Sequence, residues 1–329
     1  MATSSGSIHR TIWNSLKITG CALSVAAIAW GVGVFTPQGE VASSHADTAW
    51  LSPFKRSNTE RFNTALEKLG HPEPRRYDLN GNTVYFSTTT SLKTPQELLL
   101  DYQDEFVRQG INQDTFTALA PADEEARLLN ALQGGLSPIA ISPDHIALAG
   151  VLTKNRADSP EALRDDYLGT DNPHELFRAH RYIEISRDPD RRHTEVVASW
   201  SDEAFDYSRM VPGNDADHQA FDELVPACPG CTRLTRFADE NPGAHQVDLT
   251  FASPASADTL IHFYDQALPS RGWSLADEGD AIALASEFFE LPETGHTRRY
   301  TGPDNLGLTL VFQRDARTGH TLVHAARSR

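Results

Sequence analysis

The sequence predicts an α+β fold that follows an N-terminal transmembrane helix. Two tandem duplicated modules are expected, each built as strand, helix, strand and hairpin, with mostly antiparallel sheets. Three observations lead to this prediction. An uncharged apolar segment lies near the N-terminus, three pairs of similar segments recur in the same order along the chain, and the strand-like segments alternate between apolar and polar residues.

Length and composition are those of a folded protein with about two domains. The chain has 329 residues, of which 39% are hydrophobic, so it can bury a sizeable core. Its formal net charge of -16 repels phosphate backbones, and we therefore expect no nucleic-acid partner. The 3 cysteines are too few for a scaffold held by several disulfides.

Residues 18–35 carry no charge and are predicted to form a transmembrane anchor. A helix of this length spans about 27 Å, which is close to the thickness of a bilayer core. Arg10 and Lys17 precede the segment, whereas acidic residues follow it. The positive-inside rule then places residues 1–17 in the cytoplasm and the rest of the chain in the periplasm of a bacterium, beyond the inner membrane.

Two alternatives to an uncleaved signal-anchor stay open at this point. Ala27-Ile28-Ala29 and Ser44-His45-Ala46 both have the small-x-small pattern of a signal-peptide cleavage site. Ile18-Thr19-Gly20-Cys21 resembles a lipobox, although here the apolar segment follows the cysteine instead of preceding it. Residues 36–57 are small and polar, and we interpret them as a linker.

Two predicted helices provide the clearest sign of internal duplication. Residues 94–111 and 256–273 match at positions that keep a constant separation along the chain. The matching pairs are Leu98 with Leu260, Tyr102 with Tyr264, Phe106 with Leu268, and Gly110 with Gly272. Successive matches are four residues apart within each segment, so they fall on one face of a helix.

The expected ends of these helices agree with their sequences. Thr94-Pro95-Gln96-Glu97 is a capping box with proline at the first helical position. Gly110 and Gly272 stand where a helix commonly ends in a left-handed residue. Pro269 is expected to distort the last turn of the second helix, because proline has no N–H to donate to the carbonyl of Asp265.

Strand-like segments complete the two predicted modules. Residues 82–88 and 246–252 precede the helices, and residues 144–149 match residues 280–285 through a shared Ile-Ala-Leu-Ala pattern. Residues 183–200 match residues 310–327, and in both cases alternating apolar residues flank a polar turn, which predicts a hairpin.

These matches give the predicted domain organisation. The first module covers residues 58–209 and contains insertions, and the second covers residues 219–329. A polar, turn-rich segment separates them. Ser57-Asn58-Thr59-Glu60 is a further capping box, which predicts that the first module opens with an additional helix.

One short pattern resembles sequences outside this chain. Residues 263–273 read F-Y-x3-L-x3-G-W, which resembles a pattern that recurs in assorted exported bacterial α/β modules. The resemblance covers a small part of the chain. It implies an exported α/β module and no particular activity.

Cys228-Pro229-Gly230-Cys231 is the motif with the most specific chemistry. Its spacing suits a local disulfide, a dithiol redox pair or half of a thiolate metal site. In an oxidising compartment we expect a structural disulfide between Cys228 and Cys231. A redox pair usually lies at a helix N-terminus, whereas residues 232–237 look extended, and a zinc site would need two further ligands.

Other motifs of catalysis or cofactor binding are missing from the sequence. It has no phosphate-binding loop, no dinucleotide-binding glycine motif and no serine-nucleophile elbow. His174 and His180 have the wrong spacing for a zinc-protease helix, and His320 with His324 is expected to be a surface pair. We therefore predict no catalytic, metal or cofactor-binding residues.

These observations favour a non-catalytic binding or scaffolding role at the inner membrane. The expected partners are the membrane itself, through residues 18–35, and a protein of the cell envelope. Two alternatives remain: a periplasmic thiol–disulfide protein that uses Cys228 and Cys231, and an enzyme whose site lies in the insertion at residues 112–180, because long loops on a rigid scaffold often carry function.

Overall fold

A computed structural model describes residues 56–111, 131–155, 162, 165–166, 168–187, 192–210, 224–276 and 296–328. The anchor predicted at residues 18–35, nearly all of the predicted linker and the strand predicted at residues 280–285 lie outside these ranges. Within them, no helix is both long enough and apolar enough to cross a membrane.

The described residues form an α+β fold with antiparallel strands, as the sequence predicts. They divide into two compact units. Of the described residues, we call 56–74 together with those in Tyr85–Phe205 the N-terminal unit, and Arg75–Val84 together with those from Asp206 onward the C-terminal unit. The module ranges predicted from the sequence place residues 75–84 with the first module, whereas their contacts join them to the C-terminal unit, because β1 (Arg75–Leu79) pairs with β7 (Thr232–Asp239).

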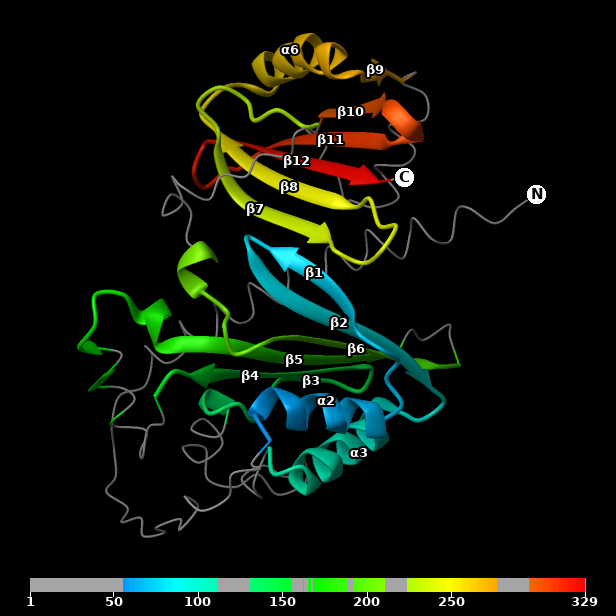
Figure 1. The fold of residues 1–329 in the computed structure, drawn as a ribbon, viewed down its shortest axis with the longest axis vertical. Coiled ribbons are helices and arrows are strands. Elements are labelled where there is room, and N and C mark those ends of the chain that lie inside the picture. The colour runs from blue at the N-terminus through cyan, green and yellow to red at the C-terminus, as the bar shows by residue number, and fades with distance from the viewer. Residues whose placement is uncertain are drawn as a thin grey trace. The chain divides into compact units, whose positions relative to one another are not determined.

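The N-terminal unit has an antiparallel sheet with two helices on one face (Figure 1). In spatial order, its strands are β3 (Ser137–Ile141), β4 (His145–Thr153), β5 (Phe177–Arg187), β6 (Thr194–Ser201) and the later part of β2 (Asn82–Ser91). The register of β5 and β6 runs from Arg187 opposite Thr194 to Arg181 opposite Trp200, which confirms the hairpin predicted at residues 183–200. A short 3-10 helix, η2 (Pro173–Leu176), precedes β5.

Helices α2 (Asn58–Lys68) and α3 (Pro95–Arg108) begin as predicted. In each helix the N-cap side chain, Ser57 or Thr94, accepts a hydrogen bond from the backbone N–H of the glutamate three residues later, and that glutamate bonds back to the cap. Gly110, just after α3, has a φ of 68°, which is the left-handed conformation expected there. The buried apolar residues of the two helices pack on those of β4, β5 and β6 to form the core of this unit: Phe62, Leu66, Leu98, Tyr102, Phe106, Ile146, Leu148, Ile183, Ile185, Val196, Ala198 and Trp200.

The strands of the C-terminal unit are antiparallel as well. In spatial order its strands are β1, β7, β8 (Val247–Ser253), β12 (Thr321–Ser328), β11 (Gly307–Arg314), β10 (His296–Thr301) and β9 (Ser274–Leu275). The pairing of β11 with β12 confirms the second predicted hairpin. Short 3-10 helices occur at η3 (Tyr207–Met210) and η5 (Pro303–Asn305).

Helix α6 (Ala257–Ala267) packs on the strands of the C-terminal unit and covers their apolar core. Its regular turns end before Pro269, where the chain continues as the 3-10 helix η4 (Pro269–Arg271), and Gly272 follows with a φ of 83°. The distortion expected from Pro269 is therefore confirmed. Leu98 of α3 and Leu260 of α6 are 6% and 2% exposed, and each faces the sheet core of its own unit.

One of the predicted matches involves residues outside the described ranges. Residues 145–149 belong to β4, which pairs with β5, and in the C-terminal unit β10 pairs with β11. Residues 280–285, the predicted counterpart of residues 144–149, lie outside the described residues.

Candidate functional site

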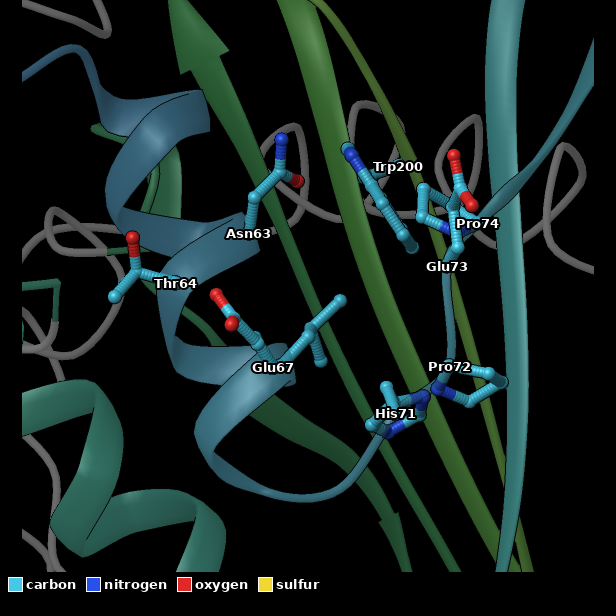
Figure 2. A pocket seen from close by; sticks show the side chains of 9 residues that line it. Asn63, Thr64, Glu67, His71, Pro72, Glu73, Pro74 and Trp200 are labelled. Atoms are coloured by element: carbon cyan, nitrogen blue, oxygen red, sulfur yellow. The ribbon is translucent and has the colours of Figure 1, made fainter.

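A pocket of about 390 Å³ lies in the N-terminal unit, between α2, residues 71–74 and the end of β6 (Figure 2). Its size is at the lower end of the range found for small-molecule sites. Its lining residues are Asn63, Thr64, Leu66, Glu67, His71, Pro72, Glu73, Pro74 and Trp200. The described parts of the insertion at residues 112–180 contribute no residue to this lining.

Helix α2 supplies one wall of the pocket. Asn63 and Glu67 are four residues apart and therefore lie on the same face of the helix, and both are exposed to solvent. Phe62 and Leu66, on the neighbouring face, anchor the helix in the core. The helix ends at Lys68, and Gly70, with a φ of 83°, turns the chain back so that His71 and the prolines that follow it form the opposite wall.

The imidazole of His71 is held by hydrogen bonds to two other polar side chains. Its Nδ1 lies 3.1 Å from Ser87 Oγ and its Nε2 lies 2.6 Å from the hydroxyl of Tyr102. Ser87 Oγ donates to the carbonyl of Pro72, so it accepts from His71, which places the proton on Nδ1. Nε2 then accepts from Tyr102. Both ring nitrogens are thus already hydrogen-bonded within the protein.

Burial controls the protonation of His71 and Tyr102. Desolvation lowers the pKa of His71 to about 4, against a weaker opposing effect of its hydrogen bond with Ser87. Desolvation also raises the pKa of Tyr102 well above its ordinary value. At neutral pH the imidazole and the phenol are therefore both uncharged, and His71 is a poor proton donor or acceptor for a molecule in the pocket.

Trp200 closes the inner end of the pocket. Its ring is 2% exposed and packs against Tyr85, with ring centroids 5.7 Å apart, and edge-on against Phe62 at 5.6 Å. The indole Nε1–H is buried and has no hydrogen-bond partner among the described residues. Figure 2 shows the nitrogen of this ring on the side of the pocket that faces Asn63. A buried donor without an acceptor is unfavourable by about 1–3 kcal/mol, so an acceptor that enters here gains an available partner.

Of the residues that line the pocket, the two that are charged at neutral pH are both acidic. Glu67 and Glu73 line it, and neither has an ion-pair partner among the described residues. His71 adds no positive charge at neutral pH. The pocket therefore combines two carboxylates, one unpaired N–H donor and apolar walls made by Leu66 and two prolines. This arrangement can bind a molecule by hydrogen bonding and electrostatics, and within the described residues it holds no activated nucleophile.

The two cysteines predicted to form a disulfide lie close together in the structure. Cys228 and Cys231 lie at disulfide distance, with Cα atoms 5.3 Å apart. Cys228 is 3% exposed and belongs to the core of the C-terminal unit. The motif forms a tight turn, in which the N–H of Cys231 donates to the carbonyl of Cys228, and β7 begins at the next residue. A strand follows the pair, so the helix dipole that lowers the thiol pKa in redox enzymes does not act here.

The histidines considered from the sequence lie apart from the pocket. His174 is in η2, whereas His180 is buried in β5, with Nε2 3.3 Å from Ser199 Oγ. Nδ1 of His324 lies 3.1 Å from Thr250 Oγ1, and His320 is exposed just before β12. Within the described residues, no three His, Cys, Asp or Glu side chains are grouped so that they could hold a metal ion.

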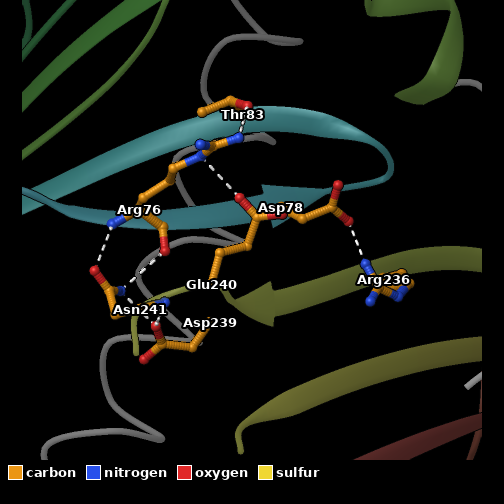
Figure 3. A network of polar contacts seen from close by, with 7 residues as sticks. All are labelled: Arg76, Asp78, Thr83, Arg236, Asp239, Glu240 and Asn241. Carbon is orange, nitrogen blue, oxygen red and sulfur yellow. Dashed lines mark hydrogen bonds and ion pairs between the residues drawn. The ribbon is translucent and has the colours of Figure 1, made fainter. Parts of the chain in front are cut away.

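A polar network joins β1 to β7 in the C-terminal unit (Figure 3). Arg76 Nε lies 2.8 Å from Glu240 Oε2, and Arg236 forms an ion pair with Asp78. The amide of Asn241 brackets the backbone of Arg76, accepting from its N–H and donating to its carbonyl. Asn80 accepts from the N–H of Arg236 in the same way. These contacts hold the two strands together.

The sequence alone does not identify the residues of the pocket. The sequence pattern predicts that Trp200 belongs to the core. The structure confirms this for the ring, but Trp200 also lines the pocket. His71 and Glu67 belong to no motif. The available signal is a histidine and two prolines directly after a helix-ending glycine, and it is a weak one.

Comparisons with known proteins add no name to this site. No family model, no curated protein and no solved structure matches the chain.

Proposed function

We propose that this protein is a single-pass inner-membrane protein whose two units lie in the periplasm and bind a ligand or partner without catalysing a reaction. The observation that carries the binding role is the pocket beside α2, with a buried indole N–H that has no acceptor among the described residues. His71, the titratable side chain at its inner end, is neutral and has both nitrogens occupied, which supports binding over proton transfer.

The anchor rests on residues 18–35 and on the charges around them. The uncharged segment is long enough for a bilayer core, and its basic flank favours a cytoplasmic N-terminus. A disulfide in the C-terminal unit fits an oxidising compartment such as the periplasm.

We further propose that the two modules arose by duplication. The order of the elements supports this: in each unit a helix, α3 or α6, follows a strand and precedes a hairpin, β5 with β6 or β11 with β12.

The two helices also correspond in detail. Each begins after a hydroxyl N-cap, Thr94 or Ser256, whose side chain accepts from the backbone N–H three residues later. Leu98 and Leu260, each four residues after its cap, are buried in the core of their own unit.

Membrane extraction tests the anchor. We expect the full chain to stay in the membrane fraction in carbonate or high salt and to be released by detergent. A periplasm-dependent reporter enzyme fused after residue 329 should be active. Release without detergent would favour a cleaved signal peptide, and a reporter active only in the cytosol would contradict the proposed orientation.

The partner in the envelope can be sought with the intact anchor. Cross-linking in whole cells, followed by purification in detergent, should recover one protein in a fixed ratio to this chain. A version with the pocket altered by Trp200→Phe, compared with the parent chain, separates partner binding from binding in the pocket. Substrate turnover by the purified full chain would instead support an enzyme with a site in residues 112–180.

A further inference from the structure

We infer that the pocket beside α2 takes a small protonated amine that carries a hydroxyl or carbonyl oxygen near its nitrogen. This inference rests on the proposed binding function and specifies the ligand class of the same site. It follows from the two carboxylates at the rim and from the indole N–H at the inner end.

The carboxylates come from opposite walls of the pocket. Glu67 lies on α2, and Glu73 lies on the segment between His71 and Pro74 (Figure 2). Both are exposed, and neither forms an ion pair with a described residue. A cation between them would face two negative charges, whereas a carboxylate or phosphate would be repelled by both.

The inner end of the pocket requires a hydrogen-bond acceptor on the ligand, whereas the rim favours a positive charge. Trp200 Nε1 is only a donor, so it can be satisfied only by an acceptor oxygen or nitrogen on the ligand. His71 cannot serve as that acceptor, because its own acceptor nitrogen already receives the hydroxyl proton of Tyr102 at 2.6 Å. The ligand therefore needs an acceptor at one end and a positive charge at the other.

The walls between these ends favour a compact carbon skeleton. Leu66, Pro72 and Pro74 present apolar surface, and the proline rings are conformationally rigid. The pocket volume of about 390 Å³ admits a ligand of few non-hydrogen atoms. An amino alcohol or an amino sugar has the required charge, acceptor and size.

A matched set of sugars tests the ligand class. Glucosamine carries an ammonium group, N-acetylglucosamine replaces it with a neutral amide, glucose has a hydroxyl at that position, and glucuronate bears a carboxylate. The full chain in detergent micelles, labelled with 15N at tryptophan, is titrated with each sugar at pH 6.5. The indole N–H signal of Trp200, assigned with Trp200→Phe, reports binding. The signal of Trp273, whose N–H is bonded to the carbonyl of Leu224, is the internal reference.

We expect glucosamine to shift the Trp200 signal and to bind at least about tenfold more tightly than the other three sugars, because each charged contact contributes on the order of one factor of ten. Glu67→Gln and Glu73→Gln should each weaken glucosamine binding several-fold while leaving the free spectrum unchanged. Asp104→Asn, which removes an exposed carboxylate of α3 outside the pocket, should leave binding unchanged.

The possible failures have different meanings. Equal binding of all four sugars at Trp200 would overturn the amine preference and leave a binding pocket, so the proposed function would stand. No shift of the Trp200 signal with an excess of glucosamine or of ethanolamine would overturn the amine inference. The proposed membrane protein would then be judged by the extraction and reporter experiments, which do not involve the pocket.

Discussion

His71 and His180 are buried titratable residues whose protonation makes the stability of the N-terminal unit depend on pH. Burial lowers the pKa of His71 to about 4 and that of His180 to about 3, from an ordinary value of 6.5. Below pH 6.5 the unfolded chain binds protons at these positions, whereas the folded chain does not until the pH approaches the lowered values. Stability is therefore fully present above about pH 6.5 and falls as the pH drops toward 4.

Replacing His71 tests this dependence. Across the window from pH 6.5 to about 4, His71 alone accounts for a loss of about 3 kcal/mol in the free energy of unfolding. We expect His71→Gln to lower stability at pH 7 by about 1–2 kcal/mol, through its lost hydrogen bonds, and to flatten the decline below pH 6.5. Urea unfolding at several pH values measures both effects. His262→Gln, at an exposed position of α6, should leave the slope unchanged; an unchanged slope in His71→Gln would show that His71 is not the group that titrates.

The reduction potential of the Cys228–Cys231 pair distinguishes a structural role from a redox role. Its buried Cys228 and the strand that follows Cys231 favour a stable bond. We expect a reduction potential below about -300 mV, as for structural disulfides. Replacing both residues with alanine should lower the stability of the C-terminal unit by about 2 kcal/mol, because the closed loop is short. A potential near those of cellular oxidoreductases, about -270 to -120 mV, would support the thiol–disulfide alternative instead.

Among the secondary-structure elements, β1 and β7 are joined by an ion pair between Asp78 and Arg236 as well as by backbone hydrogen bonds. Asp78 and Arg236 are 19% and 27% exposed, and a double-mutant cycle isolates their interaction. We expect Asp78→Asn and Arg236→Gln to be coupled by about 0.5–1 kcal/mol, decreasing with added salt. The more exposed Lys93–Asp101 pair serves as the comparison and should show weaker coupling. Equal coupling in the two pairs would mean that the partial burial at β1 and β7 adds nothing.

Elements with strong local signals can be predicted well from the sequence. Capping boxes at Ser57 and Thr94 fix helix starts, and left-handed glycines at Gly110 and Gly272 mark helix ends, because these signals depend on a few neighbouring residues. The hairpin between β1 and β2 also has a clear local signal in the sequence. Asn80-Gly81, with φ values of 51° and 82°, is the favoured pair for a two-residue hairpin turn.

Features that depend on distant parts of the chain could not be predicted in this way. No local pattern indicates that β1 pairs with β7, which lies far along the chain, and this pairing decides to which unit β1 belongs. The pocket likewise requires α2, residues 71–74 and Trp200 to meet, and Trp200 alone is indistinguishable from any core tryptophan.

At the scale of the whole molecule, the orientation in the membrane depends on very few basic residues. Arg10 and Lys17 precede the proposed anchor. We expect Arg10→Gln combined with Lys17→Gln to reduce the activity of a C-terminal periplasmic reporter, because orientation follows the basic residues of the short flanking segments. Lys55→Gln with Arg56→Gln removes the same charge on the other side and should leave activity unchanged. Full activity after loss of Arg10 and Lys17 would mean that another feature sets the orientation.

The place of β1 beside β7 has a consequence for concentrated protein. When β1 is displaced, the backbone groups of β7 that paired with it are left at an open edge, and such an edge can pair with the equivalent edge of a neighbouring molecule. Mild denaturant that detaches β1 should therefore produce dimers joined through two β7 strands. Dilution of such dimers into buffer would return monomers only slowly, because two strands must separate before each β1 can re-form its own ladder.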